Sequence, residues 1–314
     1  MNDSKMTDIR PFGPEAITAA ARLILRGYPV AVPTETVYGL AADALNGDAV
    51  ARIYAAKGRP NFNPLIVHCP NLAVAETLGL FGDAEYALAE YFWPGPLTLV
   101  VPKSPDCAVA SLAMAGLDTL AIRVPAHRAM QAVMKASGRP LAAPSANASG
   151  KVSPTRAEHV KASLEGRIEL VVDDGPCEAG VESTIVRVKD GALEVLRHGP
   201  ITAEKLAEVS GLSVTGVAGS EIIAPGMLAS HYAPGKPVRL DAAEFAAEEF
   251  SIGFGALDGD FNLSPQGDLT EAAARLFDAL HAGAASAKPS IAVAAMPRHG
   301  LGAAIYDRLS RAAV

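Results

Sequence analysis

The sequence predicts an α/β fold, and three observations support this class. Short runs rich in Val, Ile and Leu alternate with longer helical stretches through the first two hundred residues. Half of the 314 residues are hydrophobic and 19% are charged, so the chain can bury a sizeable core. Two apolar runs flank Asp190–Gly191, a dipeptide typical of β-hairpins, so the sheet should be mixed rather than wholly parallel.

Strands and helices are expected to alternate up to residue 211. The expected strands are 28–33, 63–68, 97–102, 120–125, 140–145, 170–175, 183–188 and 193–198. The expected helices are 49–57, 71–79, 84–93, 128–137, one that begins at 155, and 201–211. Asp48, Asn71 and Thr155 are predicted to cap helices, because their side chains can accept hydrogen bonds from the free N–H groups of a first turn. Thr155 with Glu158 reads as a T-x-x-E capping box.

The regular pattern ends after residue 211. Residues 212–236 are rich in Gly, Pro and Ser, and we interpret them as a linker long enough to act as a lid. Residues 237–314 predict a second, small α/β domain with strands at 237–240, 250–255 and 290–297 and amphipathic helices at 269–283 and 300–313. The predicted organisation is therefore 1–211, 212–236 and 237–314.

Composition limits the functions to be considered. A formal net charge of −7 argues against a protein whose whole surface binds nucleic acid, although it permits a local basic pocket. No apolar run is long enough to cross a membrane, and the first residues lack the apolar segment of a signal peptide. The three cysteines are widely spaced with no CxxC pair, which predicts reduced thiols and a cytoplasmic location rather than a zinc site.

Common catalytic signatures are missing. The chain contains no GxGxxG after the first expected strand, no GxxxxGK[ST], no HExxH and no GxSxG. The seven histidines show no spacing typical of metal ligands. A Rossmann dehydrogenase, a P-loop kinase and a zinc hydrolase are therefore not favoured.

Polar residues instead gather where apolar strands begin or end. They are PTETVYG (33–39), KGRPNFN (57–63), His68, Thr119, Arg123, Ser145, Asn147, Ser153, Glu182–Thr184 and Arg197. Because ligands of open α/β sheets bind beyond strand ends, these groups could converge on one polyanion. Plainer explanations stay open: the amides could form turns, the 57–63 loop could be a solvated surface, and Arg123 could pair with a carboxylate of the protein itself.

Seven motifs occur in a fixed order: PTETVYGL, KGRPNFNPLIVH, PGPLTLV, RVPAH, APSANASG, ESTIV and RHGPI. In this combination the chain resembles the YrdC-like family of threonylcarbamoyl-AMP synthases, over residues 15–235. PGMLASHYAP followed by a small α/β domain is similar to the longer, two-domain branch of that family. The resemblance implies a YrdC-like twisted mixed sheet with flanking helices and a small C-terminal Rossmann-like α/β domain.

The resemblance also implies an activity. The protein would be a nucleotidyltransferase that joins L-threonine, bicarbonate and ATP to give L-threonylcarbamoyl-AMP and pyrophosphate, with Mg²⁺ held mainly by the phosphates rather than by protein side chains. The product would pass to the tRNA threonylcarbamoyl-transferase complex, which modifies the adenosine next to the anticodon. A weak direct contact with tRNA or double-stranded RNA is left open, and no membrane partner is expected.

The site residues implied by the resemblance follow the motifs. The K-x-R…S-x-N signature corresponds to Lys57, Arg59, Ser145 and Asn147, of which Lys57 and Arg59 would be catalytic. ATP contacts would come from Arg59, Asn63, Thr119, Ser145, Asn147, Ser153, Arg197 and Tyr232. Threonine contacts would come from Thr36, His68, Arg123, Ala143 and Ser183. The chain departs from the family at Leu228 and Ala229, where basic or aromatic residues are more common, which puts contacts by these two side chains in doubt.

The residue types suit such a reaction. A carbamate reverts readily in water, and its transfer to the α-phosphate depends on positioning and charge neutralisation, which cations and a water-excluding lid supply. Three rival functions remain: a double-stranded RNA-binding module, a carbamoyl transferase of hydrogenase maturation, and a nucleotide-binding regulator without turnover. Net charge weighs against the first, and the absence of CxxC against the second.

Overall fold

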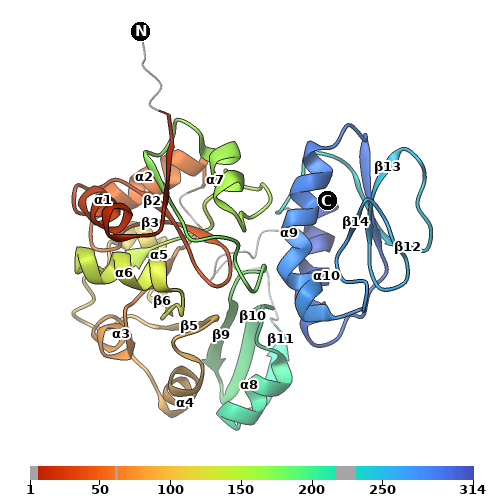
Figure 1. Ribbon diagram of the computed structural model, residues 1–314. Helices are drawn as coiled ribbons and strands as arrows, with labels where there is room; N and C mark the ends of the chain where they lie inside the picture. The colour runs from red at the N-terminus through yellow and green to blue at the C-terminus, as the bar shows by residue number, and fades with distance from the viewer. Residues whose placement is uncertain (1–5, 61–62, 217–230) are drawn as a thin grey trace.

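The computed structural model describes residues 6–60, 63–216 and 231–314 and arranges them in two α/β units that lie side by side (Figure 1). The larger unit has an eleven-stranded sheet and the smaller unit a four-stranded sheet. The predicted α/β class with a mixed sheet is confirmed. The boundaries at 211 and 236 stay predictions, because residues 217–230, most of the expected linker, lie outside the described residues, as do Leu228 and Ala229.

The large sheet has the strand order β1-β8-β2-β3-β7-β4-β6-β5-β9-β10-β11. Its strands are β1 (Asp8–Pro11), β2 (Val30–Pro33), β3 (Tyr38–Asp43), β4 (Ile66–His68), β5 (Leu97–Pro102), β6 (Thr119–Arg123), β7 (Leu141–Ala142), β8 (Leu170–Asp173), β9 (Thr184–Lys189), β10 (Ala192–Arg197) and β11 (Val214–Gly216). β4 and β6 are parallel, whereas β9 and β10 form the predicted antiparallel hairpin about Asp190–Gly191. Both hairpin residues have positive φ, as a tight two-residue turn requires.

Helices flank this sheet. They are α1 (Pro14–Leu25), α2 (Gly47–Lys57), α3 (Leu72–Leu78), α4 (Asp83–Phe92), α5 (Ser111–Met114), α6 (Arg128–Ser137), α7 (Ala157–Leu164) and α8 (Ala203–Ser210). α1 and α6 pack on β2, β7 and β8 through one apolar cluster, which includes Ile24, Val32 and Met130. The largest cluster lies between the sheet and α2, α4, α7 and α8. In the described part of the chain, every helix is too short or too polar to cross a membrane.

The face of β4, β5 and β6 that turns away from the largest cluster carries few apolar side chains. Side chains alternate along a strand, so Leu120 and Ile122 enter the largest cluster while Ala121 and Arg123 take the opposite face. That opposite face carries a five-residue apolar cluster, made of Ile66, Val100, Ala121, Ile185 and Leu196. Polar groups beside this small cluster are therefore available for a ligand.

The smaller unit is a parallel sheet with two helices. Its strands are β12 (Val238–Ala242), β13 (Glu249–Gly253), β14 (Phe261–Asn262) and β15 (Ser290–Ala294), in the order β12-β15-β13-β14, and its helices are α9 (Leu269–Ala285) and α10 (Leu301–Ala312). Every pairing in this sheet is parallel, as expected for strands joined by crossovers. α9 lies at the boundary between the two units (Figure 1).

Some elements escaped prediction or begin elsewhere than expected. β1, α1, β3, α5, β11 and β14 were not predicted. Asn71 caps α3 as predicted, since its side chain accepts from Val74 N at 3.0 Å. The prediction for Asp48 was wrong, because the side chain of Asn46 caps α2 and accepts from the amides of Asp48 and Ala49.

The predicted capping box was also wrong. α7 has Arg156 at its N-cap with no side-chain cap. Thr155 donates instead to the carboxylate of Asp278 on α9, with Oγ1 2.6 Å from Oδ1. A charge-assisted hydrogen bond to the smaller unit therefore replaces the local cap that the sequence pattern indicated.

The two units share an apolar contact. Val37, Val152 and Val181 of the larger unit belong to the same buried cluster as the core of the smaller unit. Gly180 approaches α9 so closely that a Cβ atom there would lie 2.3 Å from Ala273 O, and its φ is +68°. Only glycine fits this position, so the close approach of the two units depends on it.

Polar contacts reinforce this boundary. Arg156 pairs with Asp278 at 2.7 Å, and the His281 ring donates from Nε2 to Ser153 O at 3.1 Å, since a carbonyl can only accept. The His281 ring stacks on His159 with 3.8 Å between ring centroids. Burial and the neighbouring His281 lower the pKa of His159 to about 4, so both rings stack in the neutral form at pH 7.

This stack predicts acid sensitivity. Unfolded His159 binds a proton near its ordinary pKa of 6.5, while the folded side chain binds one only near 4. The unfolded state therefore holds more protons between these values, and stability should fall as the pH drops from 6.5 to 4, by about 2 kcal/mol. Urea unfolding at pH 7 and pH 4.5 should show a smaller loss for His159→Gln than for the unchanged protein. The exposed His299→Gln variant is the control, and an equal loss in all three proteins would contradict the prediction.

Candidate functional site

A pocket opens on the polar face of the large sheet and contains about 520 Å³ of space, including its mouth. It is lined by Thr34, Thr36, Val37, Gly39, Arg59, Ile66, His68, Arg123, Ala143, Pro144, Ser145, Glu182, Arg197, His231 and Tyr232. Eight of the predicted site residues are among them: Thr36, Arg59, His68, Ala143, Ser145, Arg123, Arg197 and Tyr232. The pocket thus combines residues that lie up to 198 positions apart, from Thr34 to Tyr232.

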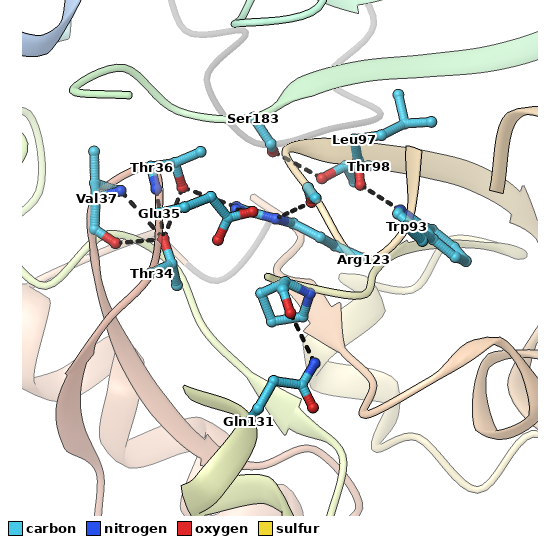
Figure 2. A network of polar contacts seen from close by, with 12 residues as sticks. Thr34, Glu35, Thr36, Val37, Trp93, Leu97, Thr98, Arg123, Gln131 and Ser183 are labelled. Atoms are coloured by element: carbon cyan, nitrogen blue, oxygen red, sulfur yellow. Dashed lines mark hydrogen bonds and ion pairs between the residues drawn. The ribbon is translucent and has the colours of Figure 1, made fainter. Parts of the chain in front are cut away.

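The sheet register brings His68 and Arg123 together. β4 and β6 are parallel with His68 opposite Arg123, so the two side chains stand beside each other on the same face. Arg123 is buried and its position is fixed on three sides (Figure 2). Nε donates to Gly95 O at 3.2 Å, Nη1 donates to Thr36 Oγ1 at 2.9 Å, and Nη2 lies 2.7 Å from a carboxylate oxygen of Glu35.

Glu35 is the internal partner of Arg123 that the sequence left open. Burial alone would raise the pKa of this carboxyl, but the charge and hydrogen bonding of Arg123 outweigh it and hold the pKa below its usual range. Glu35 is therefore ionised at neutral pH. The PTET loop thus supplies both a hydroxyl and a carboxylate to the same guanidinium.

The threonine hydroxyls of this loop form a directed chain. Thr34 donates to Val37 O at 2.7 Å, so in the 2.8 Å contact between the two threonines Thr36 is the donor. Thr36 Oγ1 accepts a hydrogen bond from Arg123, and the Thr36 hydroxyl donates its proton to Thr34 Oγ1. What Thr36 still offers the pocket is a hydrogen-bond acceptor.

His68 contributes a neutral imidazole. Burial and the Arg123 charge lower the pKa of His68 to about 3, so the imidazole ring is neutral at pH 7. Its Nδ1 has no hydrogen-bond partner among the described residues, although the atom is buried. A buried polar atom of this kind at a pocket wall indicates that a ligand or water supplies the partner.

Two further arginines make the pocket cationic. Arg59 donates from Nη2 to Pro64 O at 3.2 Å, and its buried Nε has no partner in the described part of the chain. Burial lowers the pKa of Arg59 and of Arg197 to about 10, which leaves both charged at neutral pH. With Arg123 the lining holds three guanidinium groups and one carboxylate, Glu182. The local charge is therefore positive in a protein whose net charge is −7.

Ser183 holds Arg197 in place. Arg197 donates from Nε to the Ser183 carbonyl and from Nη2 to its hydroxyl, both at 3.0 Å. The same hydroxyl shares a 2.8 Å hydrogen bond with Thr98, as Figure 2 shows. Ser183 is fully buried and does not line the pocket, so it supports the site from behind.

Lys57, which was expected to be catalytic, lies outside the pocket lining, and its catalytic role stays a prediction. Lys57 is buried, does not line the pocket, and its ammonium donates to the backbone carbonyls of Ser145 and Asn147. Burial and the Arg59 charge lower its pKa well below the ordinary value. The lysine thus organises the loop that presents Ser145, and it is Arg59 that faces the pocket.

Four other predicted contacts lie outside the lining. Asn147 donates to the carbonyls of Ala148 and Lys151, both at 2.9 Å, and Ser153 donates to Glu182. Asn63 is buried next to the Arg59 loop, and Thr119 begins β6, on the same face as Arg123 but four residues away. The buried Oδ1 atoms of Asn63 and Asn147 have no partners within the described residues. None of these four groups forms part of the pocket wall.

Tyr232 lines the pocket from the start of the last described segment, 231–314. It has a positive φ of 64°, which is uncommon for a residue with a Cβ atom and typical of functional sites. Its ring stacks on Phe277 of α9 with 5.4 Å between centroids, and Arg308 lies over the ring at 5.7 Å. The smaller unit therefore fixes this part of the pocket wall.

Sequence reasoning missed Glu35 and gave no role to Glu182 or His231. All three stand inside motifs that were singled out, beside residues that were assigned. Glu182 accepts from Ser153 and from Arg308 of α10, a partner 126 positions later that no local pattern indicates. Among the described residues no group of three His, Cys, Asp or Glu side chains could hold a metal ion.

The fold and pocket define a mixed-sheet α/β protein with a pocket lined by three arginines. The Sua5/YciO/YrdC family model, described as "Telomere recombination", matches residues 22–199, and a model described as "Threonylcarbamoyl-AMP synthase, C-terminal domain" matches residues 201–314. The chain belongs to the Sua5/YciO/YrdC family.

Two curated relatives match this chain over nearly the whole length of both proteins. The chain is 40% identical to a threonylcarbamoyl-AMP synthase of Bacillus subtilis, with 95% of this chain and 92% of the relative covered. It is also 40% identical to a threonylcarbamoyl-AMP synthase of Pyrococcus abyssi, with 94% and 93% covered. The crystal structure of P. abyssi Sua5 complexed with L-threonine superposes with a TM-score of 0.89 at 36% identity, and 98% of each chain is covered.

Proposed function

We propose that this protein synthesises L-threonylcarbamoyl-AMP from L-threonine, bicarbonate and ATP and releases pyrophosphate. The observation that carries the proposal is the single pocket in which Arg59, Arg123 and Arg197 meet, since its three cations suit an amino-acid carboxylate together with a polyphosphate. Relatives named threonylcarbamoyl-AMP synthase match this chain over nearly their whole length, and a solved relative is described as complexed with L-threonine. The product would serve the threonylcarbamoyl modification of tRNA in the cytoplasm.

The threonine half of the pocket is assigned to the Arg123 side. The Arg123 guanidinium can pair with the substrate carboxylate. In the structure, Glu35 is its negatively charged partner. Thr36 offers an acceptor to the substrate hydroxyl, and the neutral, unpartnered His68 Nδ1 and the Ala143 backbone lie on the same wall. A valine would leave the Thr36 acceptor unmatched, which disfavours it as substrate.

The ATP half is assigned to Arg59, Ser145, Arg197 and Tyr232, with Asn63, Thr119, Asn147 and Ser153 around it. Arg59 and Arg197 face the space where the triphosphate would lie. Lys57 would act indirectly, because its hydrogen bonds hold the loop that carries Ser145. Mg²⁺ would enter on the nucleotide phosphates.

The chemistry asks the protein mainly for positioning. A carbamate oxygen of N-carboxylated threonine attacks the α-phosphorus, and pyrophosphate leaves on the opposite side. The arginines stabilise the charge of the transferred and leaving groups, and a pocket shielded from water slows reversal of the carbamate. A protein that catalyses these steps is a nucleotidyltransferase, and the reaction needs no covalent intermediate with the enzyme.

The proposed function predicts strict dependence on all three substrates. Pyrophosphate release is expected only when ATP, L-threonine and bicarbonate are present together, and omission of any one should reduce it to the background rate. The adenylate product should be detected by mass spectrometry in the complete mixture alone. Release of pyrophosphate without threonine, or salt-sensitive binding of double-stranded RNA without any turnover, would contradict the proposal.

A further inference from the structure

The polar groups of the pocket explain the rejection of valine but not the rejection of serine. Arg123 and Thr36 are joined by a 2.9 Å hydrogen bond, so the two side chains can reach the carboxylate and the hydroxyl of one amino acid (Figure 2). Serine carries the same carboxylate, amine and hydroxyl as threonine. Only an apolar contact with the methyl group of threonine can therefore separate these two amino acids.

An apolar row crosses the sheet beside these polar groups. His68 faces Arg123 across β4 and β6, and two positions earlier on the same strands Ile66 faces Ala121. On the other side of β4, the amide of Ala143 donates to Ile66 O at 3.0 Å. Because side chains two residues apart share a face of a strand, this row lies next to the His68–Arg123 pair, on the same face of the sheet.

Ile66 is the large side chain of this row. Its neighbours Ala121 and Ala143 end at Cβ, and Gly39 approaches Ala143 so closely that a Cβ atom there would lie 3.3 Å from the Ala143 Cβ. Ile66 lines the pocket together with Gly39 and Ala143. Since small residues stand on both sides of it, Ile66 supplies most of the apolar surface next to Arg123.

The other large apolar residues of the lining are held elsewhere. The Val37 side chain belongs to the buried cluster that is shared with the smaller unit, and Tyr232 stacks on Phe277 of that unit. Pro144 lies one residue beyond the row and directly precedes Ser145, which is assigned to the ATP half. Ile66 is therefore the apolar side chain best placed to contact the amino-acid substrate.

We propose that Ile66 selects threonine over serine: with the substrate carboxylate on Arg123 and the hydroxyl at Thr36, the methyl group of threonine packs against the Ile66 side chain. This inference rests on the proposed function and adds to it the specificity for the group on the β-carbon. The alternative is that Ile66 only fills the small apolar cluster that it shares with Val100 and Leu196. A role of that kind would affect every amino-acid substrate alike.

The test measures kcat/KM for pyrophosphate release at saturating ATP and bicarbonate. The amino acids compared are L-threonine, L-serine and L-β-hydroxynorvaline, in which an ethyl group replaces the methyl group of threonine. The unchanged protein should prefer threonine to serine by at least about tenfold, as expected for one methyl group in an apolar contact. Ile66→Ala should reduce this preference to about threefold or less, mainly because kcat/KM for threonine falls.

The same variant should also gain a substrate. The shortened side chain leaves room for one more methylene group, so Ile66→Ala should raise the ratio of kcat/KM for hydroxynorvaline to that for threonine by about tenfold. Val100→Ala is the matched control, because Val100 belongs to the same apolar cluster as Ile66 but lies outside the pocket lining. It should leave both ratios unchanged.

Each result decides between the alternatives. Equal use of serine and threonine by the unchanged protein would overturn the inference, as would unchanged ratios in Ile66→Ala or the same shifts in Val100→Ala. If Ile66→Ala does not fold, Ile66→Val takes its place and should shift both ratios in the same directions by about threefold. Unchanged ratios in that variant would contradict the inference in the same way. Failure of the unchanged protein to turn over threonine would instead refute the proposed function.

Discussion

Replacing Arg123 by methionine is expected to abolish threonine-dependent pyrophosphate release. The guanidinium is the cation assigned to the substrate carboxylate, and it also orients the Thr36 hydroxyl through a 2.9 Å hydrogen bond. Loss of such a contact in a desolvated pocket reduces kcat/KM by about two to three orders of magnitude, and loss of the threonine orientation adds to it. The measurement is kcat/KM for threonine, with the exposed Arg128→Met, which loses its pair with Asp174, as the control.

The same replacement should also destabilise the protein. It leaves the buried carboxylate of Glu35 without its cation, which typically costs about 3–5 kcal/mol. Glu35→Gln combined with Arg123→Met removes that cost while the substrate cation stays absent. We therefore expect the double variant to recover stability in urea unfolding and to remain inactive. Recovery of activity together with stability would show that Arg123 serves the fold and not the substrate.

Replacing Arg59 by methionine is expected to have the second largest effect. Its guanidinium faces the pocket with an unpartnered Nε within the described residues, so its removal should take away phosphate binding and leave the fold nearly unchanged. We expect kcat/KM for ATP to fall by about 10²–10³, with little change in the free energy of unfolding. Steady-state kinetics and urea unfolding measure the two quantities.

Lys57→Met provides the contrast. Lys57 is buried and its ammonium holds two carbonyls of the loop that carries Ser145, which would lose their partner. Both stability and the use of ATP should therefore decline, since each unpaired buried carbonyl costs about 1–3 kcal/mol. If Lys57→Met impaired only ATP use while Arg59→Met impaired stability, the roles assigned to these two residues would be reversed.

The fold class could be predicted because it depends on local patterns. Alternation of short apolar runs with helical stretches, and the Asp190–Gly191 turn, indicated a mixed α/β sheet that the structure confirms. β3 was missed because Tyr38–Asp43 is rich in small residues and continues the polar PTET motif. The two-residue β14 is too short to leave a periodic signal.

The site could be predicted only in part. Motif residues such as Arg59, His68, Arg123 and Arg197 do meet in one pocket, although on a sheet face and not simply beyond strand ends. Alternation along β6 explains this: Leu120 and Ile122 fill the main core, so Arg123 must take the other side. Which chemistry-bearing residues line the wall and which support it from behind could not be read from their types.

The sequence by itself determined the class of fold, the family and the set of motifs around the pocket, because propensity, periodicity and residue type act over a few neighbouring positions. Only the tertiary structure decided the partners of the buried charges: Glu35 for Arg123, two loop carbonyls for Lys57, and Arg308 for Glu182. A buried charge must find its counterpart wherever the fold places one. Because these partners can lie far apart along the chain, no local sequence pattern indicates which residues will pair.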